Sequence, residues 1–176
     1  MNIKSTMDLL RKVQCPQNVI AHCIAVSELA DEMAKNCDAD REIVITGALL
    51  HDIGYARSNS VKHALIGAEM ARDFGLDGLI VDIIERHIGA GIPKEEAEEL
   101  GLPEKNYMPE SLEEKIVAHA DNLTRHTTQI TIDEVIEAIQ RKLGKDHPSI
   151  ERMKRLHEEL EEICGLRDIL SSDKIS

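Results

Sequence analysis

Hydrophobic residues recur at intervals of three and four along most of the chain, the pattern of helices that bury one face. The pattern predicts a short amphipathic helix over residues 6–14 and a longer one over about 17–36. On the apolar stripe of the longer helix a histidine, His22, replaces a core residue. The chain is therefore expected to place polar chemistry inside a helical core.

A third helix ends in the sequence Ala48-Leu49-Leu50-His51-Asp52-Ile53-Gly54, where a polar pair closes an otherwise apolar run. We expect Asp40 to cap its first turn and Gly54 to take the left-handed conformation that ends helices. His51 and Asp52 then face the interior at a fixed helix end. Because an uncompensated buried carboxylate costs several kcal/mol, we expect a cation on Asp52.

Further helices are predicted over residues 63–74, 77–88, 94–100, 111–127, 131–143 and 147–164. Capping boxes at Ser111–Glu114 and Thr131–Glu134 open two of them. Residues 55–62 are predicted to be a polar linker, and residues 89–110 an irregular segment that is either a lid or a solvated insertion. We expect one more turn at residues 166–170 and fraying of residues 171–176.

The composition favours packed helices, because the 176 residues include no Trp, one Phe and two Tyr. We expect an all-α, single-domain helical bundle over residues 1–176. Its site-bearing core is expected at about 18–127, with helices from about 131–170 packing on it.

The net charge of the chain limits the kinds of molecule that it is expected to bind. There are 33 acidic and 21 basic residues, a net charge of −12, which repels nucleic acids and acidic membranes. No signal sequence or membrane-spanning stretch is found, so a cytoplasmic location is expected. Cys15, Cys23, Cys37 and Cys164 have no metal or redox spacing and are predicted to be reduced thiols, with Cys23 a core residue. The apolar helix faces are also compatible with a homodimer.

Histidines occupy the buried faces of four predicted helices, each near a helix end. Convergence on one polar cavity explains them together better than four independent core histidines, since metal sites in helical proteins are built from facing helices. Asp121 lies on an inward face of a later helix and is a second candidate buried carboxylate. The candidate site residues, in chain order, are His22, His51, Asp52, His63, His87 and Asp121.

This order resembles the HD superfamily of metal-dependent phosphohydrolases, whose signature is an early His, an adjacent His-Asp pair and a later Asp. The resemblance covers residues 18 to about 125 and implies that His22, His51, Asp52 and Asp121 hold a first metal. It implies that His63 and His87 hold a second, with Asp52 bridging. The ligands suit Fe, Mn, Co, Ni or Zn. The arrangement looks most like small HD hydrolases of dinucleoside tetraphosphates.

The chain departs from other branches of that superfamily. It has no Gly-Tyr-Pro signature of cyclic-di-GMP phosphodiesterases, and Gly54-Tyr55-Ala56 stands where HD nucleotidases have a Glu. Ile88 follows His87 where some dinuclear members have a further His.

The resemblance implies hydrolysis of a small phosphorylated substrate, a nucleotide or dinucleoside polyphosphate, by a metal-activated water. We expect Asp52 to be essential and Lys62 and Arg125 to bind phosphate oxygens, ordinary surface charge being their alternative. His119, His126, His147 and His157 are predicted to be structural or exposed. Two other functions stay open: a non-catalytic nucleotide-binding or sensor domain, and a di-iron oxygenase.

Overall fold

The computed structural model describes residues 2–170, apart from the side chains at positions 168 and 169. The expected all-α class is confirmed, since helices dominate and one small hairpin accompanies them. The expectation for residues 171–176 lies outside the described residues. The elements are α1 (Ile3–Lys12), α2 (Gln17–Ala34), α3 (Arg41–Leu50), the 3-10 turn η1 (Ile53–Ala56), α4 (His63–Asp73), α5 (Gly78–Arg86), α6 (Lys94–Glu99), α7 (Leu112–Asn122), β1 (Thr124–Arg125), β2 (Thr128–Gln129), α8 (Ile132–Leu143), α9 (Pro148–Cys164) and α10 (Leu166–Leu170).

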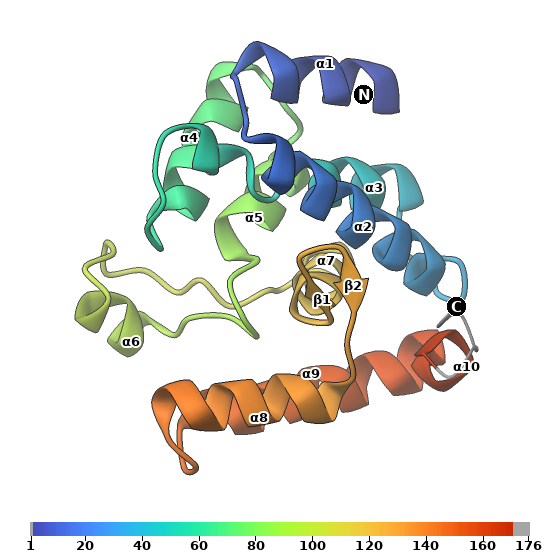
Figure 1. Cartoon of the computed structure of the whole chain (residues 1–176), viewed down its shortest axis with the longest axis vertical. Helices are drawn as coiled ribbons and strands as arrows, with labels where there is room; N and C mark the ends of the chain where they lie inside the picture. Colours follow the sequence, from blue (N-terminus) through green and yellow to red (C-terminus); the bar gives the residue numbers. More distant parts are fainter. Residues whose placement is uncertain (1, 171–176) are drawn as a thin grey trace.

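The helices form two groups that meet at α7 (Figure 1). Helices α1 to α5 make the upper part of the molecule, and α8, α9 and α10 make the lower part. One apolar core joins α2, α3, α7 and α9 through fully buried residues such as Met33, Ile116 and Leu160. A second core, with Leu50 and Ile84 at its centre, lies among α1, α3, α4 and α5. Helix α7 therefore sits between the groups, where Asp121 can face the other candidate residues.

The helix predicted over residues 111–127 is shorter than expected, because α7 ends at Asn122. Residues 124–129 form an antiparallel hairpin in which Arg125 pairs with Thr128, and His126 at the turn has a φ of 57°. Thr124 Oγ1 donates to Ala120 O at 2.8 Å, so a side chain closes the helix end. The run of threonines, which favours strands over helices, explains the difference.

Gly54 does not end a helix in the left-handed conformation, so that expectation is wrong. Helix α3 ends at Leu50 with His51 as its C-cap, and Gly54 lies inside η1. A Cβ atom at Gly54 would lie 1.9 Å from His63 O and 2.8 Å from Gly67 N. The glycine is needed because the η1 backbone passes directly against α4.

Helix ends elsewhere follow their capping residues. Asp40 Oδ1 accepts from the backbone N–H groups of Glu42 and Ile43, as expected of an N-cap. Helix α1 begins at Ile3, earlier than predicted, because Asn2 Oδ1 accepts from Ser5 N at 2.9 Å. The two predicted capping boxes, at Ser111–Glu114 and Thr131–Glu134, are both present.

One buried carboxylate links α7 to α5. Glu114 is 3% exposed and accepts from the backbone of Glu110 and Ser111 at the start of α7. Its Oε2 also accepts from Arg86 Nη1 at 3.0 Å, at the last residue of α5. His87 directly follows this end of α5, whereas Asp121 lies at the opposite end of α7. Within residues 2–170, no helix combines the length and the apolar character needed to cross a membrane.

Candidate metal centre

The structure brings all six candidate residues into one cluster, although they come from five helices. His22 lies on α2, His51 and Asp52 follow the end of α3, and His63 opens α4. His87 is the C-cap of α5, and Asp121 lies in the last turn of α7. Five of the six sit at or next to a helix end, where a short side chain can reach a shared point, and His22 alone lies inside its helix.

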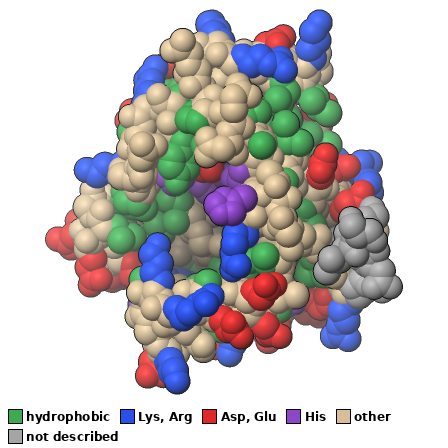
Figure 2. All heavy atoms as spheres, in the orientation of Figure 1, with side chains coloured by type: hydrophobic (Ala, Val, Ile, Leu, Met, Phe, Trp, Pro, Cys, Tyr) green, Lys and Arg blue, Asp and Glu red, His purple; other side chains and the backbone are tan. Residues whose placement is uncertain are grey.

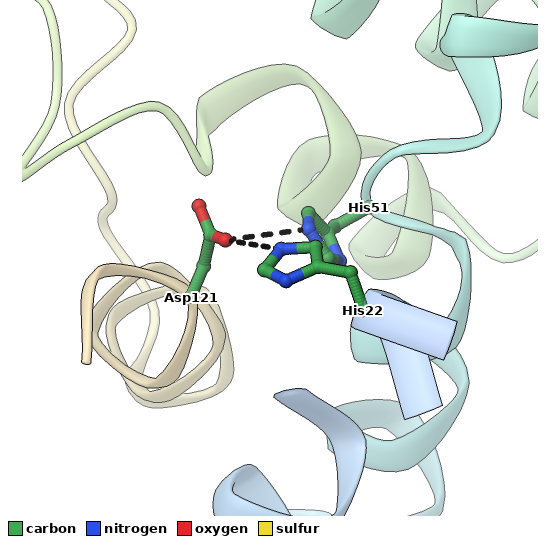
Figure 3. A group of neighbouring side chains, drawn as sticks. All are labelled: His22, His51 and Asp121. Carbon is green, nitrogen blue, oxygen red and sulfur yellow. Dashed lines mark hydrogen bonds and ion pairs between the residues drawn. The ribbon is translucent and has the colours of Figure 1, made fainter. Parts of the chain in front are cut away.

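The first group of potential ligands, which we name site A, consists of His22, His51 and Asp121 (Figure 3). Asp121 Oδ1 lies 2.9 Å from His22 Nε2 and 3.5 Å from His51 Nε2. The three ligand atoms all lie within 4.8 Å of one another. Both imidazoles face the carboxylate from one side, and the other carboxylate oxygen points away from them.

The second group, site B, consists of Asp52, His63 and His87. Asp52 Oδ1 lies 3.1 Å from His63 Nε2 and 3.4 Å from His87 Nε2, and the two nitrogens are 3.1 Å apart. The other oxygen of the same carboxylate, Oδ2, lies 3.4 Å from His51 Nε2 and 4.0 Å from His22 Nε2. Asp52 therefore faces both sites, one oxygen toward each.

Backbone carbonyls fix the orientation of all four imidazoles. The Nδ1 atom of each lies 2.7–2.8 Å from a carbonyl oxygen, which accepts only, so Nδ1 carries the proton. The Nε2 atoms then present lone pairs to the centre of the cluster, as metal-ligating histidines do. The carbonyls belong, for His22, His51, His63 and His87 in turn, to His126, Ala48, Ser60 and Ile84.

The donor set fits a divalent cation. With their Nδ1 atoms protonated, His63 and His87 point two Nε2 lone pairs at each other across 3.1 Å, beside an anionic oxygen of Asp52. His51 Nε2 is buried and has no hydrogen-bond partner among the described residues. Such a concentration of acceptors repels itself unless positive charge lies among them. Imidazole and carboxylate together suit transition metals without selecting one.

The titration of the cluster follows from the same contacts. Burial raises the pKa of Asp52, but the charge of His51 and the close imidazoles of His63 and His87 outweigh it and lower that pKa far below its ordinary value. Burial lowers the pKa of His51, but the nearby anionic groups, Asp52 foremost, hold it well above the ordinary value. At Asp121 burial also raises the pKa, but the neighbouring His22 and His51 outweigh it and lower that pKa, so both carboxylates stay ionised and the cluster attracts protons or metal ions.

Three neighbours of the cluster were missed in the sequence. Tyr55, in the predicted polar linker, stacks on the His63 ring with centroids 4.1 Å apart. Cys23 is fully buried, as expected of a core residue, and it also forms a third possible ligand group with His51 and Asp52. The carbonyl of His126 orients His22 from the hairpin. An aromatic residue in so aromatic-poor a chain was a usable signal, whereas a backbone carbonyl gives none.

The two candidate phosphate-binding cations are placed differently. Lys62 is exposed just before α4, and its ammonium forms no ion pair with any described residue. Arg125 is exposed on β1 and lines a cavity of about 630 Å³.

The remaining histidines lie outside the cluster. Among them His119 Nε2 lies 2.9 Å from His157 Nδ1, and burial lowers the pKa of His119 to about 3.

The cavity lies beside the cluster. Ile88 and Asn122, which line it, directly follow His87 and Asp121 in the chain. Figure 2 shows histidine side chains in the middle of this face, with a hollow beside them and Lys and Arg side chains at its lower edge. The cluster therefore has an adjacent space of the size that holds small-molecule ligands, roughly 300–1,000 Å³.

Comparison with known proteins identifies relatives of this chain. A protein of Methanocaldococcus jannaschii with no assigned function is 49% identical over 165 residues, covering 91% of this chain and 97% of the relative. The tRNA (cytidine(56)-2'-O)-methyltransferase of Picrophilus torridus is 45% identical over 161 residues, 92% of this chain. The chain spans about half of that methyltransferase, 46% of its length.

Among solved structures, the HD domain of the L. monocytogenes phosphodiesterase PgpH, in complex with cyclic-di-AMP, matches with a TM-score of 0.60. That match covers 96% of this chain and 99% of the other at 19% identity, so it shows a shared fold. The family model of the HD domain matches residues 19–126, more than half of the chain and all six residues of the cluster. The chain therefore belongs to the HD-domain family that its His and His-Asp pattern resembles.

Proposed function

We propose that this protein is a metal-dependent phosphohydrolase that cleaves a phosphoester or phosphoanhydride bond in a small nucleotide, using two divalent ions. The observation that carries the proposal is the Asp52 carboxylate, whose two oxygens face two separate groups of ligands. Divalent ions bound at such a pair of sites neutralise phosphoryl charge and acidify water. The reaction adds water across one P–O bond, giving a phosphate and a protonated leaving group.

The chain's own residues have three tasks in this reaction. The four Nε2 lone pairs and the Asp52 oxygens hold positive charge at fixed positions, because the Nδ1 hydrogen bonds prevent the rings from turning. Asp121 uses Oδ1 toward the histidines, which leaves Oδ2 to accept a hydrogen bond from the attacking water. Arg125, at the adjacent cavity, is placed to bind a phosphate oxygen.

Two observations support a nucleotide as the substrate. The HD domain with the same fold belongs to a phosphodiesterase and was solved with cyclic-di-AMP, a small nucleotide. The cavity beside the cluster has room for an organic group as well as a phosphate. A dinucleoside polyphosphate, the substrate class expected from the resemblance, is compatible with both observations.

The test is to load the purified full chain anaerobically with Mn²⁺ or Fe²⁺, measure metal per chain, and screen nucleotide hydrolysis. The panel includes a dinucleoside tetraphosphate and cyclic-di-AMP. We expect about two ions per chain and phosphate or nucleotide release that needs no dioxygen. Asp52→Asn should abolish release, while Asp8→Asn, the same change at an exposed residue of α1, should retain it.

Three outcomes would contradict the proposal: full turnover by Asp52→Asn, product formation that requires dioxygen, or tight nucleotide binding without turnover under any metal. The second outcome would favour a di-iron oxygenase and the third a sensor domain.

A further inference from the structure

The cavity of about 630 Å³ lies between the HD core and the two long C-terminal helices. One side consists of residues of the core, including Ile92 and Asn122. The other side belongs to α8 and α9, with Val135, Ala138 and Met153 among its residues. Because the family model ends at residue 126, α8 and α9 lie outside the matched region. About half of the residues that line the cavity beside the candidate metal centre therefore belong to elements outside the part of the chain that matches the family.

The walls are chiefly aliphatic, but they carry one acceptor whose direction is fixed. Both hydrogens of the Asn122 amide are used, since Nδ2 donates to Gly89 O at 2.7 Å and to Ala118 O at 2.6 Å. The Oδ1 atom of Asn122 is left as the acceptor that can contact a ligand. Asn122 lines the cavity and directly follows Asp121 of site A, so the residue lies between the cavity and the cluster.

Positive charge is also available in this cavity. Arg125 and Lys142 both line it, and neither forms an ion pair with a described residue. Arg152 is neutralised by Glu96 through two contacts of 2.8 and 2.6 Å, which tie α9 to α6 across the cavity. Glu99 is the other acidic lining residue. In a chain of net charge −12, two cations that form no ion pair with a described residue and line a cavity beside the cluster favour an anionic ligand.

We propose that this cavity binds the nucleoside part of the substrate, with its base between α8 and the core and its phosphate toward the cluster. The inference rests on the proposed function, and it adds that α8 and α9 determine substrate specificity. A flat ring with a hydrogen-bond donor edge uses the aliphatic walls and Asn122 Oδ1 together, and the attached phosphate uses Arg125. A purely apolar chain would leave the acceptor and the cations without partners.

The test compares two ligands that share a phosphate and a ribose. The Mn²⁺-loaded full chain is titrated calorimetrically with adenosine 5′-monophosphate and with ribose 5-phosphate, which lacks the base. If the monophosphate is turned over, its KM replaces its Kd. We expect the wild type to bind the nucleotide at least about tenfold more tightly, the range of one buried base.

The decisive experiment compares the ligand preference of the wild type with that of a variant whose cavity is filled. Ala138→Trp places an indole into the space from α8, and we expect it to remove the preference while ribose 5-phosphate binds as before. Gln140→Trp is the matched control, because residue 140 is on the same helix, about 200° around it, and does not line the cavity. It should keep the preference.

Equal binding of the two ligands by the wild type would overturn the inference, as would an unchanged preference in Ala138→Trp. Circular dichroism melting of both tryptophan variants shows whether they fold. If Ala138→Trp does not fold, Ala138→Leu is tested with the same criteria. A base preference that persists without hydrolysis of any nucleotide would retain this inference and reject the proposed function, so the two failures are distinguishable.

Discussion

Sites A and B contain similar side chains but are assembled in different ways. In site B the carbonyls that fix His63 and His87 lie three residues earlier in the chain, at Ser60 and Ile84. In site A, His22 is fixed by the carbonyl of His126, 104 residues away, and its carboxylate partner Asp121 is 99 residues away. Site B is prepared by local structure, whereas site A exists only when α2, α7 and the hairpin have come together.

The side chains of sites A and B also differ in their exposed fractions. The side chains of His63 and His87 are 8% and 3% exposed, and those of His22 and Asp121 are 17% and 22% exposed. The cavity borders both sites, since Ile88 and Asn122, which directly follow His87 and Asp121, line it. If each site holds an ion, we expect site B to anchor its ion rigidly and site A to present its ion to the substrate, and four tests would separate these roles.

The largest effect is expected from Asp52, because its carboxylate serves both sites. Asp52→Asn should lower kcat about 10³-fold or more and remove both ions, since several kcal/mol of charge stabilisation is lost. Asp121→Asn should remove chiefly the ion of site A. Metal analysis by mass spectrometry and steady-state kinetics measure both. Equal metal loss in the two variants would remove the distinction between the sites.

Gly54 tests how rigidly site B is held. The Cβ of Gly54→Ala would meet the carbonyl of His63 and the backbone of Gly67, so α4 must shift. We expect a loss of about 2–3 kcal/mol of stability, which lowers Tm by roughly 5–10 °C, together with weaker binding at site B. Gly78→Ala is the control, because no atom lies within 4 Å of its new Cβ. Equal melting temperatures for the two variants would contradict the close approach described here.

The hairpin turn tests the long-range support of site A. His126 has a φ of 57°, so His126→Val places a β-branched residue in the left-handed region and should displace the carbonyl that holds His22. We expect metal affinity at site A to fall about tenfold, with site B unchanged. His126→Gly keeps the turn and should bind as the wild type does. Competition with a chromogenic chelator gives both affinities, and a loss in the glycine variant would mean that the His126 side chain matters instead.

The smallest effects are expected at the two candidate phosphate-binding cations. Arg125→Ala should lower kcat/KM about tenfold, the value of a charged hydrogen bond, because Arg125 lines the cavity beside site A. Lys62→Ala should change kcat/KM by less than about threefold, as for an exposed surface charge. Steady-state kinetics on the identified nucleotide distinguish them. A larger effect at Lys62 would place the phosphate on the site B side.

Periodicity predicted the fold class and most helices, because a buried stripe must recur every three to four residues. The same reasoning singled out His22, His63 and His87, since a polar residue on an apolar stripe interrupts the pattern. It missed the hairpin at residues 124–129, where the helical pattern of α7 appeared to continue and β-branched threonines ended it.

What could not be predicted depends on contacts between distant segments. Gly54 has a local signature that fits a helix end, but its reason is the backbone of α4. The cavity has no signature, because its walls are ordinary apolar positions of α8 and α9 whose space depends on how these helices dock. The carbonyl of His126 that orients His22 belongs to the backbone. Because every residue has a backbone carbonyl, no sequence pattern could have identified this one.

The buried carboxylate of Glu114 has a consequence for how the cluster keeps its alignment. A helix that turns by one residue rotates its side chains by about 100°, which would carry Asp121 out of reach of His22. Glu114 prevents this rotation from the far end of α7, since one carboxylate caps the helix and grips Arg86 beside His87. The Glu114–Arg86 ion pair thereby fixes the rotational position of Asp121, which lies about two turns further along α7, without contacting the ligands.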